Sequence, residues 1–84
     1  MKKRNWIIAA CCSEGESIDF LRFQGTDEEV KEKIADMVTK DSTEGEFESG
    51  STSVKDMEVN AQGEIRAYAC FKDFHIDYAA IQVN

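Results

Sequence analysis

The segment from Thr26 to Val38 predicts an amphipathic helix, and it constrains the fold more than any other part of the chain. Thr26 and Glu29 form the T-x-x-E capping box that begins a helix, with acidic residues in the first turn. Four apolar residues follow at helical spacing and form one stripe: Val30, Ile34, Met37 and Val38. Because this stripe must be buried, the helix has to cover one apolar surface of the remaining chain.

The two segments before this helix have the composition of strands. Residues 5–12, NWIIAACC, are apolar and bounded by charges, which predicts a strand in the interior of a sheet, buried on both faces. Residues 18–25, IDFLRFQG, follow a polar break with a central glycine. This arrangement predicts an antiparallel hairpin between the two strands.

The region after the helix is mostly polar up to residue 63. Residues 41–53 predict a long polar loop in which Phe47 is the single large apolar residue. Residues 54–59, VKDMEV, fit either a short strand or a turn of helix, and residues 60–63 predict a turn.

The last twenty residues before Asn84 predict two strands. Residues 64–83 contain neither glycine nor proline and are too long for one strand. The polar pair Lys72-Asp73 divides them into a strand over 64–71 and a strand over 74–83, joined by a tight turn. The alternative is one long bent strand with a bulge.

These elements predict a single α+β domain over residues 1–84. One helix packs on a four- to five-stranded, mostly antiparallel sheet in the order ββα(β)ββ. A hairpin, a helix and returning strands resemble the β-grasp (ubiquitin-like) arrangement, in which the first and last strands lie parallel at the centre of the sheet. The alternative is another α+β topology with the same order of elements.

The formal charge of −7 comes from 17 acidic and 10 basic side chains. Contacts with a phosphate backbone depend on clustered Lys and Arg, so we expect no direct binding of nucleic acid. The glycines are scattered through turns, which favours no phosphate-binding loop, and we expect no cofactor. The apolar run WIIAACC is much shorter than the ~18 residues of a membrane span, so we expect a soluble cytoplasmic protein without membrane contact.

The three cysteines are Cys11, Cys12 and Cys70, an odd number without C-x2-C spacing. This pattern favours neither a disulfide framework nor a zinc site, and we expect buried or half-buried free thiols. The sequence leaves open whether one of them is reactive. With one histidine and no nucleophile motif, we expect no enzyme activity; a thiol–imidazole pair of Cys70 and His75 is the remaining alternative.

The stretch CFKDFHIDY holds the one histidine between two aspartates. On a strand, Asp73, His75 and Asp77 fall on one face and apolar residues on the other. The polar face either binds a small ligand or a metal, with a raised pKa of the histidine, or is the solvent face of an amphipathic strand. Alternate residues lie about 7 Å apart, too far for two of them to hold one ion at ~2 Å, so we favour the structural interpretation and expect no metal site.

Acidic residues form the other candidate surface, on the helix and in the 41–53 loop. The candidate contact residues in the loop are Glu44, Glu46, Phe47 and Glu48. Such a surface keeps a protein soluble, or it binds a basic partner as nucleic-acid mimics do. An exposed strand edge is a further candidate, because it can pair with a second copy.

The tail YACFKDFHIDY, with the acidic capped helix and the start NWIIAA, resembles short uncharacterised bacterial proteins of the kind encoded near mobile elements. The resemblance covers most of the chain and implies a bacterial cytosolic protein with a host-interaction role. We expect a non-enzymatic module that binds another protein, as a monomer or a homodimer. The alternatives are a small-ligand or metal-binding module through Asp73, His75 and Asp77, and an acidic nucleic-acid-mimic inhibitor from a mobile element.

Overall fold

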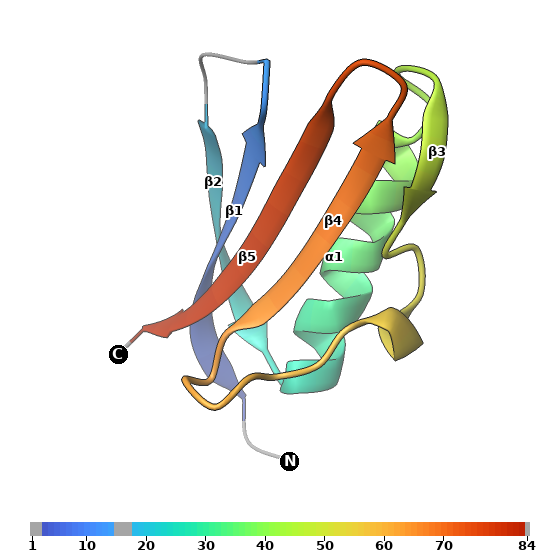
Figure 1. Cartoon of the computed structure of the whole chain (residues 1–84). Helices are drawn as coiled ribbons and strands as arrows, with labels where there is room; N and C mark the ends of the chain where they lie inside the picture. Colours follow the sequence, from blue (N-terminus) through green and yellow to red (C-terminus); the bar gives the residue numbers. More distant parts are fainter. Residues whose placement is uncertain (1–2, 15–17, 84) are drawn as a thin grey trace.

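The computed structural model describes residues 3–14 and 18–83, which form one layer of sheet and one layer of helix (Figure 1). The elements are β1 (Arg4–Cys12), β2 (Ile18–Gly25), α1 (Asp27–Asp41), β3 (Phe47–Gly50), the 3-10 turn η1 (Val54–Asp56), β4 (Ile65–Phe71) and β5 (His75–Val83). The strands form one sheet in the order β2-β1-β5-β4-β3, and all neighbours run antiparallel. The predicted α+β class and element order are confirmed.

Both predicted hairpins are present. β1 pairs with β2 along its length, and β4 pairs with β5 across a tight turn at Lys72-Asp73. The amide of Phe71 donates to the carbonyl of Phe74 at 2.8 Å and closes this turn. The alternative of one long bent strand over residues 64–83 is therefore wrong.

The β-grasp resemblance does not hold for the direction of the strands. β1 and β5 are neighbours inside the sheet, as that arrangement requires, but they pair antiparallel, with Ile8 opposite Ala80 and Ala9 opposite Ala79. The tight hairpin makes β5 antiparallel to β4, and because β4 runs in the same direction as β1, β5 is antiparallel to β1 as well.

The core lies between α1 and one face of the sheet. Helix residues Val30, Ile34, Ala35 and Val38 are buried, and the sheet contributes the buried side chains of Trp6, Ile8, Ile65, Ala67, Ala69, Phe71, Tyr78 and Ala80. Met37, which the sequence placed in the stripe, is half-buried at its margin. Each large aliphatic or aromatic side chain buried here contributes about 1.5–3 kcal/mol to the free energy of unfolding.

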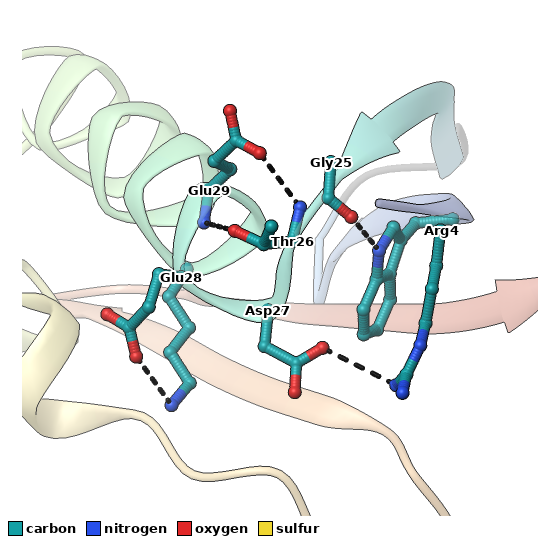
Figure 2. Close-up of polar contacts among 8 residues, drawn as sticks. Arg4, Gly25, Thr26, Asp27, Glu28 and Glu29 are labelled. Carbon is teal, nitrogen blue, oxygen red and sulfur yellow. Dashed lines mark hydrogen bonds and ion pairs between the residues drawn. The ribbon is translucent and has the colours of Figure 1, made fainter. Parts of the chain in front are cut away.

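The first turn of α1 is held by the predicted capping box (Figure 2). The Glu29 amide donates to the Thr26 hydroxyl oxygen at 3.2 Å, and the Thr26 amide donates to the Glu29 carboxylate at 2.9 Å. Beside it, the indole of Trp6 donates to the carbonyl of Gly25 at 3.1 Å, and Arg4 lies 3.7 Å from Asp27. These contacts attach the start of the helix to β1 and to the end of β2.

The last turn of α1 is attached to the sheet by Tyr78. This side chain is buried among the core residues, and its hydroxyl donates to the carboxylate of Asp41 at 2.5 Å. Burial, together with the hydrogen bond to Asp41, raises the pKa of Tyr78, so the phenol stays protonated and keeps donating. A carboxylate at the C-terminus of a helix opposes the helix dipole, and the hydrogen bond from Tyr78 offsets this cost.

The expectation that residues 5–12 are buried on both faces is wrong. In β1, Trp6 and Ile8 are buried under α1, whereas Asn5 and Cys11 on the other face are exposed. The reason is that one helix covers one face of a sheet, so an apolar strand in this fold is covered on one side. The predicted interior position of the strand is confirmed, since β1 lies between β2 and β5.

Residues 41–53 are not the long loop that the sequence predicts. α1 extends to Asp41, and β3 begins at Phe47 and pairs with β4 as an edge strand with a bulge. The ring of Phe47 packs edge-on against Phe71 at 5.6 Å, and Phe71 stacks on Phe74 at 4.4 Å. One apolar residue among polar neighbours was enough to anchor a strand, because a partner strand satisfies its backbone groups.

For residues 54–59 the sequence left a short strand or a turn of helix open, and the structure has the turn of helix; the turn predicted over residues 60–63 is confirmed. Val54–Asp56 form one turn of 3-10 helix, Met57 is buried, and Val59 makes an isolated bridge to Ile65. The side chain of Asn60 accepts from two backbone amides of the following turn, which Gly63 completes with a φ of +79°.

Two adjacent residues of β1 test this one-sided burial. We expect Ile8→Ala to lower the free energy of unfolding by about 2–5 kcal/mol, because it opens a cavity under α1. We expect Ile7→Ala, on the half-covered side, to lower it by less than about 1.5 kcal/mol. Urea denaturation in dilute solution measures both values. Equal losses in the two variants would contradict the one-sided core.

The capping box predicts a specific sensitivity to acid. The hydrogen bond from the Thr26 backbone amide lowers the pKa of Glu29 below its ordinary value of 4.5. A lowered folded pKa means that the ionised carboxylate stabilises the fold above pH 4.5 and that this contribution is lost as the pH falls through the folded pKa. As the pH falls below 4.5, we therefore expect the free energy of unfolding to decrease more steeply for the wild-type protein than for Glu29→Gln.

Denaturation of both proteins at several pH values measures this difference. Glu32→Gln is the matched control, because it makes the same change at an exposed position of α1 outside the capping box. Parallel pH profiles for wild type and Glu29→Gln would argue against the capping carboxylate as the cause.

Candidate functional site

The candidate site is the face of the sheet opposite α1, which we call the open face. It consists of the odd-numbered residues of β1 and β5 and the even-numbered residues of β2 (from Phe20) and β4, because side chains alternate along each strand. In Figure 1 the helix lies against the other side of the sheet, and no helix in residues 3–14 and 18–83 covers this face.

The large hydrophobic side chains that the described chain exposes all lie on the open face. Phe20 is 67% exposed, Tyr68 47%, Ile81 45% and Val83 39%. Scattered exposed hydrophobic residues are normal on a protein surface, but a contiguous group on one face marks a binding surface. These four residues come from three different strands, so only the sheet brings them to one face.

The strand register joins three of these four residues into a contiguous group with smaller apolar neighbours, whereas Tyr68 lies beside this group, opposite Asp77. Ile7 lies opposite Ile81, and Ala9 lies opposite both Phe20 and Ala79. With Val83, which follows on β5, these residues form what we call the apolar patch: Ile7, Ala9, Phe20, Ala79, Ile81 and Val83. The two alanines make its centre shallow between larger side chains.

Two shallow hollows adjoin the apolar patch on the side of β2. One, of about 500 Å³, is lined mostly by open-face residues at the end of the sheet, among them Asn5, Gln24 and Val83. The other, of about 280 Å³, lies between Ile7, Phe20 and Arg22. Both are open to solvent and flat compared with a ligand pocket, which suits contact with another protein surface more than enclosure of a small molecule.

The charges on the open face balance, in contrast to the chain as a whole. Arg22 and Arg66 stand against Asp77 and against Glu64, which directly precedes β4 and lies 3.6 Å from Arg66. The acidic residues of α1 lie on the other side of the molecule, where Glu28, Glu32 and Asp36 are exposed. The surface is therefore divided into a neutral, partly apolar face and an acidic remainder.

The predicted Asp73, His75 and Asp77 group is only partly brought together. His75 and Asp77 lie on the open face, with 3.4 Å between the imidazole Nε2 and the Asp77 carboxylate, and both are more than half exposed. Asp73 lies in the turn before β5, so the expected strand face of three residues is wrong for this member. Within residues 3–14 and 18–83, no group of three metal-ligating side chains is close enough to hold an ion.

The strand register also places all three cysteines. Cys11 is exposed on the open face opposite Asp77, and the half-buried Cys70 lies directly opposite His75. The turn at Lys72-Asp73 resets the alternation, so Cys70 and His75 share a face, which sequence parity alone did not predict. Half-buried Cys12 lies on the helix side. The expectation of buried or half-buried thiols is wrong for Cys11.

The candidate residues of the 41–53 segment lie away from the apolar patch: Glu44, Glu46, Phe47 and Glu48. Glu44 and Glu46 are exposed in the turn after α1, and Glu46 lies 3.8 Å from Lys72. Phe47 is turned into the core against Phe71, so it is not the exposed anchor that a loop of this composition suggested. Glu48 is exposed on the edge strand β3.

Sequence reasoning missed the apolar patch although a signal was present. In each strand, the patch residues alternate with the residues that face the helix and so point to the other side of the sheet: Ile7 and Ala9 in β1, Phe20 in β2, and Ala79 and Ile81 in β5. Strands with apolar residues on both faces and one predicted helix leave one apolar face uncovered. The sequence was instead interpreted as a strand buried on both sides.

Comparison with models of protein families, with curated proteins and with solved structures found no match. None of the helices in the described residues is long and apolar enough to cross a membrane. The proposals below therefore rest on the residues and geometry of this chain.

We expect no change in melting temperature when Zn²⁺ or Mn²⁺ is added in excess. His75 and Asp77 are neighbours, but two exposed ligands bind an ion too weakly to stabilise the folded state by mass action. Differential scanning fluorimetry with and without metal measures the effect. A rise in melting temperature that His75→Ala abolishes would show that this end of the open face binds metal.

Proposed function

We propose that this protein is a non-enzymatic module that binds another protein through its open face. The observation that carries the proposal is that Phe20, Tyr68, Ile81 and Val83, the exposed large hydrophobic residues of the described chain, gather on this one face. The sequence alone pointed to the acidic helix, the 41–53 segment or a sheet edge, and the open face replaces these as the binding surface.

The composition of the open face suits a protein interface. Aromatic residues and arginine are enriched at such interfaces, and here Phe20, Tyr68, Arg22 and Arg66 surround the aliphatic side chains. Covering the exposed parts of Phe20, Ile81 and Val83 contributes on the order of 1 kcal/mol for each side chain, which favours association and, with the other contacts across the face, offsets its entropic cost.

The cytoplasmic setting, the bacterial origin and the host-interaction role are part of this proposal. The origin and the role rest on the sequence resemblance, and the setting rests on the resemblance and on the short apolar run at residues 6–12. Free thiols at Cys11, Cys12 and Cys70 agree with a reducing compartment. The small-ligand or metal-binding module and the nucleic-acid-mimic inhibitor remain the alternative functions. The mimic uses the acidic side of the molecule, so variants of the two sides separate it from the present proposal.

We expect the double variant Phe20→Ser/Ile81→Ser to lose a partner that the wild-type protein retains. Both side chains are exposed, so the variant is expected to fold while two of the large side chains of the apolar patch are lost. The measurement is affinity capture from the source cells with mass spectrometry of the retained proteins, the immobilised chain included. Circular dichroism confirms that the variant is folded.

The matched control is Glu32→Ser/Asp36→Ser, which changes two exposed residues on the opposite side. Retention by wild type and control but not by the patch variant supports the proposal. Retention that is lost only in the control would favour the nucleic-acid mimic instead and contradict binding through the open face.

A further inference from the structure

The distribution of charge determines which kind of partner the open face can accept. A chain of net charge −7 carries balanced charges here, with Arg22 and Arg66 against Glu64 and Asp77. A strongly basic partner would be drawn to the acidic side of the molecule, and a strongly acidic one would be repelled by the chain as a whole. The open face therefore suits a partner surface that is itself neutral and apolar.

The open face is such a surface, and we propose that its partner is a second copy of this chain, packed face to face. This inference rests on the proposed function, that the open face binds protein, and it names the partner. In this arrangement the apolar patches of two chains cover each other, and the acidic sides of both chains point away from the interface.

The two central strands make the patch suited to packing on itself. Ile7 and Ala9 on β1 lie opposite Ile81 and Ala79 on β5, so both strands present the same pair of side chains to a partner sheet. A two-fold axis between the facing sheets lays isoleucine and alanine of one copy on isoleucine and alanine of the other. Isologous interfaces of this kind are common in homodimers, and aligned sheets pack about 10 Å apart.

The flanks of the patch can also be satisfied by a second copy. The register places Phe20, Ala9, Ala79 and Arg66 in one row across β2, β1, β5 and β4. A two-fold axis parallel to the strands lays β2 over β4 of the second copy, which sets the ring of Phe20 over Arg66. Phe20 is 67% exposed and the Arg66 side chain 68% exposed, so both are free to make this cation–π contact.

The same axis brings unlike charges together. Arg22 lies in the next row, beside Ile7, and it then faces Glu64 of the second copy. Both flanking contacts occur twice in the dimer because of the symmetry. Contact between like charges is the usual obstacle to self-association of a charged protein, and this arrangement brings no like charges together at the flanks.

The size of the face is compatible with a dimer that dissociates. Four strands about 4.8 Å apart and about eight residues long, with a rise of ~3.3 Å each, span roughly 500 Å². Two such faces bury about 1,000 Å², which is near the lower limit for a specific interface. The expected dimer is therefore in equilibrium with the monomer and not obligate.

Sedimentation velocity of the purified chain tests this proposal, over protein concentrations from about 1 µM to about 1 mM. We expect the average mass to rise from one chain to two. Phe20→Ser/Ile81→Ser should raise the dissociation constant by more than ~10-fold, and Glu32→Ser/Asp36→Ser should leave it unchanged. Circular dichroism of dilute samples keeps loss of folding separate from loss of association.

Cys11 supplies a second measurement because it lies exposed on the open face. In the dimer it is covered, so its alkylation, mapped by mass spectrometry, should slow as the protein concentration rises. The same concentration series of Phe20→Ser/Ile81→Ser should show a constant rate. Loss of the concentration dependence in the variant supports an interface on this face.

A wild-type chain that is monomeric at all these concentrations overturns the second copy as partner. If that monomer still retains another protein in the capture experiment, and the patch variant does not, the proposed function stands with a different partner. If neither association nor patch-dependent capture is seen, both proposals are wrong. Association that the patch variant leaves unchanged also overturns the face-to-face dimer and points to pairing at a strand edge.

Discussion

The packing of the apolar stripe of α1 on one face of the sheet is the interaction on which the rest of the structure depends. The buried side chains of the helix form one core with those of the sheet. The helix contributes Val30, Ile34, Ala35 and Val38, and the sheet contributes Trp6, Ile8 and Tyr78 among others. A domain of this size has room for one such interface, so its stability rests on a single contact between two layers. Everything on the far side of the sheet is left to other uses.

Polar contacts at both ends of α1 keep this interface in register. At the start of the helix, the capping box lies next to the hydrogen bond from the Trp6 indole to the Gly25 carbonyl (Figure 2). At the other end, the hydroxyl of Tyr78 donates a hydrogen bond to the carboxylate of Asp41. Both Trp6 and Tyr78 are buried, so their polar atoms need partners: the last residue of β2, just before the helix, supplies one, and the last residue of α1 supplies the other. The same two aromatic side chains thus fill the core and fix the helix along its length.

The limit of one covered face gives the open face its functional meaning. Exposed hydrophobic side chains such as Phe20, Ile81 and Val83 lower solubility unless a partner covers them, and the proposed association rests on this. The division of charge supports the same proposal, because the exposed acidic residues of α1 lie opposite a face whose charges balance. Association through this face hides apolar surface without bringing the acidic sides together.

The helix, its cap, the hairpins and the α+β class could all be predicted from the sequence. These features depend on local spacing and turn chemistry, as Thr26, Glu29 and the Lys72-Asp73 turn show. The sequence also placed His75 and Asp77 on one face of a strand. It did not determine the direction of β5 beside β1, the pairing of β3 through Phe47, or the meeting of Cys70 with His75. The apolar patch joins residues of β1, β2 and β5 that are up to about 75 positions apart in the sequence. That no element of the described chain covers this patch follows from the tertiary structure and not from local sequence patterns. Local patterns show which residues can be buried, whereas the number and placement of packed layers decide which of them are.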